Sequence, residues 1–123
     1  FYSFIVALIL FTLGAVFVFS GGLLIALGVP LMNRRVPPNA WWGLRIPATF
    51  ADEEVWYEAN AASGRDAVRF GIVLVAGALV LPLLGIGPEA YALIMIVLTL
   101  VVVIAMVVRG WTLANRLYRE RNR

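Results

Sequence analysis

The sequence predicts an all-α integral membrane protein with three transmembrane helices and an interfacial amphipathic helix in the loop between the first two. Of its 123 residues, 63% are hydrophobic, and the mean hydropathy is +0.94. A soluble domain of this length could not bury that much apolar surface, so lipid must cover it. Residues 1–32, 70–88 and 90–108 carry no charge. Each run is long enough to cross a hydrocarbon core about 30 Å thick.

These runs divide a single membrane domain, residues 1–123, into five parts. In order, they are a first span at about 3–30, a motif loop at 33–65, a second span at about 67–85, a third span at about 88–109 and a basic tail at 110–123. Pro82 is expected to tighten the last turn of the second span. The sequence Gly85-Ile-Gly-Pro88 predicts a tight hairpin, with Pro88 as the first helical residue of the third span.

Small residues punctuate the first span. Gly28 and Pro30 are expected to end it, because glycine and proline commonly follow the last turn of a helix. Gly22-x-x-x-Ala26 could let a second helix approach closely. Alternatively, these glycines reflect only the frequency of glycine in membrane helices.

The motif loop is the only long polar segment between apolar runs. Thr49 with Asp52 three residues later resembles a capping box, and acidic residues favour the positive end of a helix. We therefore expect a helix from Asp52 to about Ala62 that stops at Gly64. An apolar stripe favours a position along the membrane surface; it consists of Phe50, Tyr57 and Ala61.

The loop also carries an ordered motif. It reads N-x-W-W-G-L-R-I-P-x-T from Asn39 to Thr49, then E-E-V-W-Y-E-A-N from Glu53 to Asn60, followed by Gly64-Arg65. This combination resembles the SdpI-like family of bacterial membrane proteins. The resemblance implies immunity to a secreted, membrane-active peptide toxin. The founding member of the family has additional spans and also relays the presence of the toxin by holding a repressor at the membrane, so the resemblance implies a possible signal relay here.

Two sets of candidate residues follow. We expect partner binding by the loop residues Asn39, Trp42, Gly43, Arg45, Pro47, Thr49, Glu53, Glu54, Trp56 and Tyr57. We expect interfacial or lipid anchoring by Trp41, Arg65, Arg69, Arg109 and Trp111. Arg45 is the sharpest candidate, because its guanidinium can bind a carboxylate or a lipid phosphate through two hydrogen bonds. The alternative is an internal salt bridge to a loop glutamate, Glu53, Glu54 or Glu58.

Arginine placement predicts the orientation. Five arginines lie in the motif loop and at the start of the second span, five lie in the tail, and none lies in the second hairpin. The positive-inside rule therefore places the loop and the C-terminus in the cytoplasm and the N-terminus outside. The expected location is the bacterial cytoplasmic (inner) membrane.

Composition also excludes several classes of function. The chain has no histidine, cysteine or lysine, so we expect no cofactor, no metal and no Schiff-base chemistry. A net charge of +3 is too small and scattered for a nucleic-acid binder. Spans without acidic, basic or amide side chains argue against a lone pump or transporter.

Three functions stay open. The first is protection against a peptide toxin, in which the spans engage the toxin and the loop engages a cytoplasmic regulator. The second is a small accessory subunit of a larger membrane protein complex. The third is a lipid-modifying enzyme that uses Arg45 and the loop carboxylates, although we expect no enzyme. The lipid bilayer is a partner in each case.

Overall fold

The computed structural model describes residues 2–122, and within that range it contains helices and no strand. The elements are α1 (Tyr2–Met32), α2 (Pro47–Ala51), α3 (Glu53–Val80), the 3-10 helix η1 (Leu81–Leu84) and α4 (Pro88–Arg121). Three helical segments of this range are long and apolar enough to cross a membrane. The predicted all-α fold with three membrane-spanning helices is confirmed.

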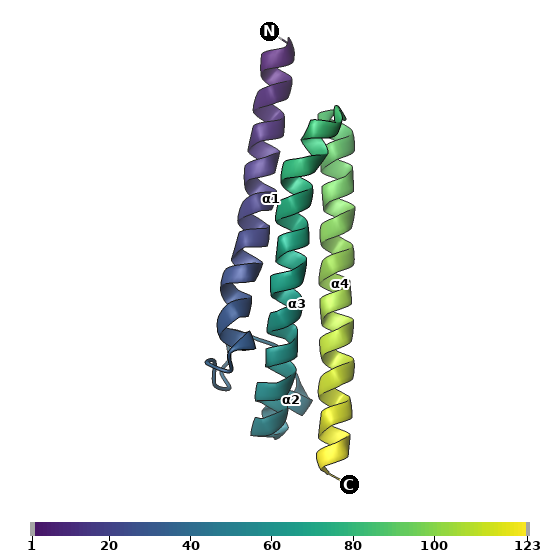
Figure 1. Cartoon of the computed structure of the whole chain (residues 1–123). Helices are drawn as coiled ribbons and strands as arrows, with labels where there is room; N and C mark the ends of the chain where they lie inside the picture. The colour runs from purple at the N-terminus through teal and green to yellow at the C-terminus, as the bar shows by residue number, and fades with distance from the viewer. Residues whose placement is uncertain (1, 123) are drawn as a thin grey trace.

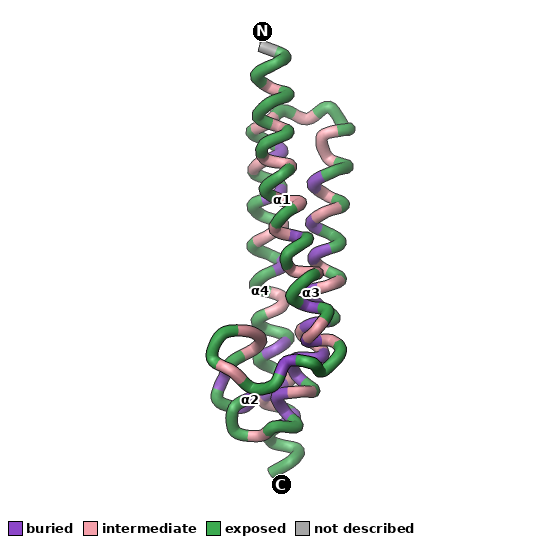
Figure 2. Tube along the Cα trace, turned by 90° about the vertical axis from the view of Figure 1, so that its left-hand side faces the viewer, coloured by how far each residue is buried: buried purple, intermediate pink, exposed green. Residues whose placement is uncertain are grey.

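The three long helices lie side by side, with α3 between α1 and α4 (Figure 1). Neighbouring helices run antiparallel, so η1 lies toward the N-terminal end of α1, while α2 and the end of α4 lie at the opposite end. Helix α1 packs almost entirely on α3 and touches α4 little. Figure 2 shows buried residues along α3 and α4 and around α2, while most of α1 is exposed.

Two glycine pairs bring α1 and α3 into backbone contact. A β-carbon added at Gly21 would lie 2.7 Å from the carbonyl oxygen of Gly71, and one at Gly28 would lie 2.8 Å from that of Gly64. The pairs are seven residues apart on both helices, the spacing that returns to the same face of a coiled pair. Nothing lies within 4 Å of a β-carbon at Gly22. The close approach is therefore real, but the Gly22-x-x-x-Ala26 face does not form it.

The hairpin between α3 and α4 follows the predicted turn chemistry. Residues 81–84 tighten into η1 around Pro82, Gly85 adopts a left-handed φ of +75°, and Pro88 occupies the start of α4. Beside this hairpin, Tyr91 is fully buried, and its hydroxyl donates to the carbonyl of Ala78 at 2.9 Å. This bond joins α4 to α3 at the end of the bundle opposite the motif loop.

The first span does not end at Gly28 and Pro30 as predicted, because α1 continues to Met32. Proline near a helix end removes only one late backbone bond, so the last turn tolerates it. Gly28 is a contact residue, not a terminator. The chain leaves the helix at Arg34, where φ is +59°.

The interfacial helix is not present as a separate element. Residues 53–62 are helical as predicted, but they are the first turns of α3, which runs unbroken through Gly64 to Val80. Gly64 does not stop the helix. Its role is different: with no side chain, it makes room for α1. The tail likewise continues α4 without a break. Asp52, not Thr49, caps α3 by accepting from the backbone N–H of Glu54 at 2.9 Å.

We call residues 33–65 together with residues 110–121 the cap, because they pack together at one end of the bundle. Its core is formed by buried side chains from α2, the loop before it, α3 and α4, namely Ile46, Ala48, Val55, Ala59, Ala114 and Leu117. Burial of these apolar side chains thus holds the motif loop against α3 and α4.

Candidate functional site

The ends of the bundle differ in charge. All the arginines of the described range lie on the cap or at its border with the bundle, and Glu89 is the one charged side chain of residues 2–122 near the hairpin. Arg69 on α3 and Arg109 on α4 are the first arginines beside the uncharged parts of those helices. These two residues therefore mark the boundary between the apolar bundle and the polar cap.

Asn39 builds the first turn of the motif. Its side-chain oxygen accepts from the backbone N–H groups of Trp41 at 2.8 Å and Trp42 at 2.6 Å, while its amide donates to the carbonyl of Pro37 at 2.8 Å. The indole of Trp42 donates to the carbonyl of Leu27 on α1 at 3.2 Å. Both predicted residues thus fold the loop back against α1.

Asn60 and Thr49 hold the next part of the loop. The side-chain oxygen of Asn60, buried on α3, accepts from the backbone N–H of Leu44 at 2.6 Å. Gly43 sits beside it with φ +110°, and a β-carbon there would lie 2.6 Å from that oxygen. The buried Thr49 hydroxyl accepts from the backbone N–H of Ile46 at 3.1 Å. Glycine at 43, threonine at 49 and asparagine at 60 therefore each fit the path of the loop backbone.

Trp56 belongs to the core of the cap. Its side chain is fully buried, and its indole donates to the carbonyl of Val36 at 2.8 Å. The ring of Phe50 lies 5.5 Å from it, centroid to centroid. Buried in this way, Trp56 is placed to support the loop.

Other motif residues lie at the surface. Arg45, Pro47, Glu53 and Glu54 are exposed, and Tyr57 is half-buried. The internal salt bridge considered for Arg45 does not form, since within residues 2–122 Arg45 pairs with no acid. Its guanidinium instead turns back and donates to the carbonyl of Ala40.

The predicted lipid anchors also lie outward. Trp41 is 88% exposed and Trp111 is 50% exposed. The exposed arginines of this set are Arg65, Arg69 and Arg109.

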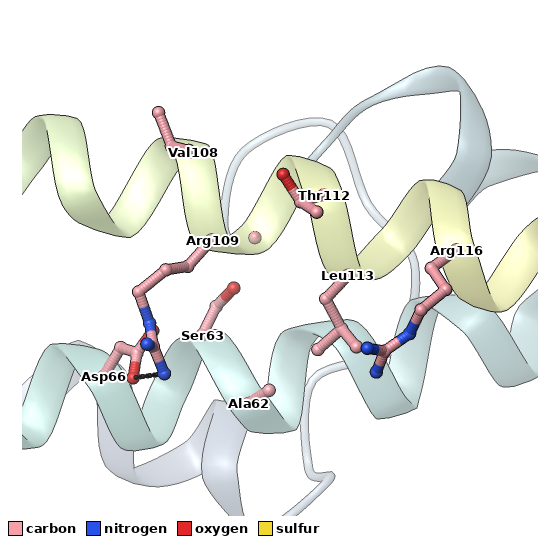
Figure 3. Close-up of a pocket in the computed structure, with 9 residues that line it drawn as sticks. Ala62, Ser63, Asp66, Val108, Arg109, Thr112, Leu113 and Arg116 are labelled. Carbon is pink, nitrogen blue, oxygen red and sulfur yellow. Dashed lines mark hydrogen bonds and ion pairs between the residues drawn. The ribbon is translucent and has the colours of Figure 1, made fainter.

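One ion pair joins α3 and α4 at the border of the cap. Arg109 donates through Nε to Asp66 Oδ2 at 2.8 Å and through an Nη to Oδ1 at 3.2 Å (Figure 3). Asp66 is buried, and Arg69 approaches the same carboxylate at 3.8 Å. The sequence marked Arg69 and Arg109 but missed their shared partner. An isolated acid at the edge of an apolar run was the available signal.

A family model described as the SdpI/YfhL protein family matches residues 35–110, more than half of the chain. The chain belongs to this family. Searches of curated proteins and of solved structures found no match. The family match, together with the three long apolar helices, makes it a multi-pass membrane protein.

In this SdpI/YfhL family member the matched range contains residues 35–65 of the motif loop, α2, α3 and most of α4. A second ion pair links this range to the tail: Arg121, near the end of α4, donates to Asp52 at 2.7 Å. The Arg121 guanidinium and the backbone N–H groups of Glu54 and Val55 hold the pKa of Asp52 below its ordinary value. Asp52 therefore stays ionised at neutral pH, caps α3 and fastens the tail to the motif loop.

Proposed function

We propose that this family member is a binding protein that confers immunity to a membrane-active peptide toxin, the role that the family resemblance implies. The observation that carries the proposal is a folded, polar cap built from the family motif on an apolar three-helix bundle. Such a protein can meet an inserted peptide through its helices and a cytoplasmic protein through its cap.

The bundle supports binding of a peptide within the bilayer. Helices α1 and α4 flank α3 and touch each other little, so both offer long apolar faces to the lipid. Residues 3–32, 70–88 and 90–108 contain no aspartate, glutamate, lysine, arginine or histidine. Because ion and proton pathways normally use such groups, recognition fits these helices better than transport does.

The cap supports binding of a cytoplasmic partner, and with it the possibility of signal relay. Arg45 is exposed and has no acidic partner within residues 2–122, so it can pair with a carboxylate of another protein. Trp41 exposes 88% of its surface a few residues away. Arginine and tryptophan are among the residues enriched at binding hot spots. We propose no enzymatic activity for these residues.

A second candidate function is that of an accessory subunit in a larger membrane complex. Exposed aromatic side chains recur along α1 at spacings of seven and eight residues, which places them on one face of the helix. They are Phe4 at 68%, Phe11 at 76% and Phe19 at 70% exposure. This stripe fits the packing of α1 against another membrane helix.

Survival of a toxin-sensitive bacterium that expresses the chain tests the first candidate. Wild type is expected to restore growth in the presence of the toxin, and Arg45→Lys at equal membrane level is expected to restore much less. Arg119→Lys, an equally conservative change at an exposed tail position, serves as the matched control. Equal growth of cells with and without the chain in the presence of the toxin would reject the proposal. Recovery of wild type in a fixed complex from mild detergent would then favour the accessory role.

A further inference from the structure

An open groove of about 420 Å³ lies between α3 and α4 at the border of the cap (Figure 3). Its polar lining comes from both helices and consists of Ser63, Asp66, Arg109, Thr112 and Arg116. Within residues 2–122 the Ser63 hydroxyl forms no hydrogen bond to protein, and Figure 3 shows it directed from α3 toward α4. The groove therefore presents both cations and a free hydroxyl donor.

Asp66 orients one of these cations. The buried carboxylate takes Nε and one Nη of Arg109 in a two-pronged pair, which holds the planar guanidinium in one position. The Arg109 side chain is still 61% exposed, and its remaining N–H groups have no protein acceptor among the described residues. A guanidinium held along one edge and open along the other is prepared to bind an anion.

The charge around the groove is positive. Arg69 lies 3.8 Å from Asp66 with its side chain 67% exposed. Arg116 is 60% exposed and meets only Glu120, at 3.9 Å, which is the outer limit of an ion pair. Arg69 and Arg109 thus contact one buried carboxylate, and Arg116 adds a third positive charge farther along the groove.

The position of the groove relative to the membrane indicates which anion it meets. Immediately beyond Arg69 and Arg109 the helices are uncharged for residues 70–88 and 90–108. Arginines next to such runs lie at the level of the lipid headgroups. A phosphate at this level belongs to the lipid that already surrounds the protein.

We infer that this groove binds the phosphate of an anionic phospholipid, with Arg109 and Arg116 as cationic donors and Ser63 as a hydroxyl donor. Asp66 positions Arg109 and does not touch the ligand. A choline headgroup adds a cation that the arginines repel, so anionic lipids are preferred over phosphatidylcholine. The site is independent of toxin binding and of the role proposed for Arg45.

Lipid binding to the purified full chain in a zwitterionic detergent tests the inference. The probes are short-chain phosphatidylglycerol, short-chain phosphatidylcholine and inorganic phosphate, followed by native mass spectrometry. Wild type is expected to retain phosphatidylglycerol in preference to phosphatidylcholine. Arg116→Gln is expected to lower the affinity for phosphatidylglycerol about fivefold, the effect of one arginine at a lipid surface.

Arg119→Gln removes the same charge from the same helix outside the groove, and it is expected to change the affinity less than twofold. Ser63→Ala removes the groove hydroxyl with no change in charge and is expected to weaken binding as well. Equal affinities of wild type and Arg116→Gln would overturn the inference. Displacement of the lipid by an equal concentration of inorganic phosphate would also overturn it, because the site would then take the free anion.

Discussion

Gly28 and Gly64 face each other across the α1–α3 contact with no side chain between their backbones. A β-carbon at Gly64 would lie 2.5 Å from the carbonyl oxygen of Gly28, and one at Gly28 would lie 2.8 Å from that of Gly64. Gly21 and Gly71 repeat the arrangement one heptad away. Membrane helices have little hydrophobic drive to associate, so close backbone packing of this kind is what holds them together.

Gly64→Ala is expected to destabilise the bundle by about 1–3 kcal/mol, the usual effect of overpacking a close contact. Thermal unfolding in detergent, followed by circular dichroism, measures this change. Gly22→Ala is the matched control, because nothing lies within 4 Å of its added methyl group. A Gly64→Ala protein as stable as this control would contradict the role given to the glycine pair.

Trp56→Phe is expected to loosen the cap. It keeps an aromatic ring in the buried position but removes the indole donor and leaves the carbonyl of Val36 without its partner. Loss of a buried partner typically destabilises by about 1–3 kcal/mol. Hydrogen exchange of the residue 33–65 amides should accelerate in this variant. The same change at the exposed Trp41 should leave exchange unaltered, and equal effects at both sites would refute the assignment.

The contact between Asp52 and Arg121 is expected to weaken in acid and to stay unchanged at neutral and mildly alkaline pH. The Arg121 hydrogen bond lowers the pKa of Asp52 below its ordinary value of 3.8. A carboxyl whose pKa is lower in the folded state stabilises the fold above its unfolded pKa and loses that effect as the pH falls through the folded pKa. We therefore expect hydrogen exchange of the tail amides near Arg121, corrected for the pH dependence of exchange in an unstructured peptide, to be constant between pH 8 and about 5. Below about pH 4 it should become faster.

Asp52→Asn supplies the control for this pH effect. The variant cannot ionise at this position, so its tail should be loose at neutral pH and show no further step in acid. A tail that is released between pH 7 and 5 in wild type would exclude Asp52 as the titrating group.

Two variants, each with one cysteine introduced into this cysteine-free chain, can report the orientation in the membrane. Glu89 and Glu58 are both exposed and lie at opposite ends of the bundle. Because the arginines gather at the Glu58 end, Glu89→Cys should react with a membrane-impermeant maleimide in intact cells, whereas Glu58→Cys should react only after lysis. The reverse pattern would invert the proposed topology.

Local patterns in the sequence were enough to predict the class of fold and the order of its helices. Uncharged runs of sufficient length are a local property, and they predicted the three spans correctly. Turn chemistry is local as well, so Pro82, Gly85 and Pro88 predicted the hairpin that the structure contains. The spacing of motif residues along the loop identified the family before any contact was known.

The roles of several of these residues depend on how the helices pack against one another. Gly64 resembles a helix stop until α1 is placed against it, and Trp56 resembles a surface residue until the loop folds over it. Asp66 and Arg109 are 43 positions apart, so their pairing follows from how α3 and α4 align. Periodicity reports which side of a helix is apolar. It cannot report which distant residue lies opposite, because that depends on the packing of the whole bundle.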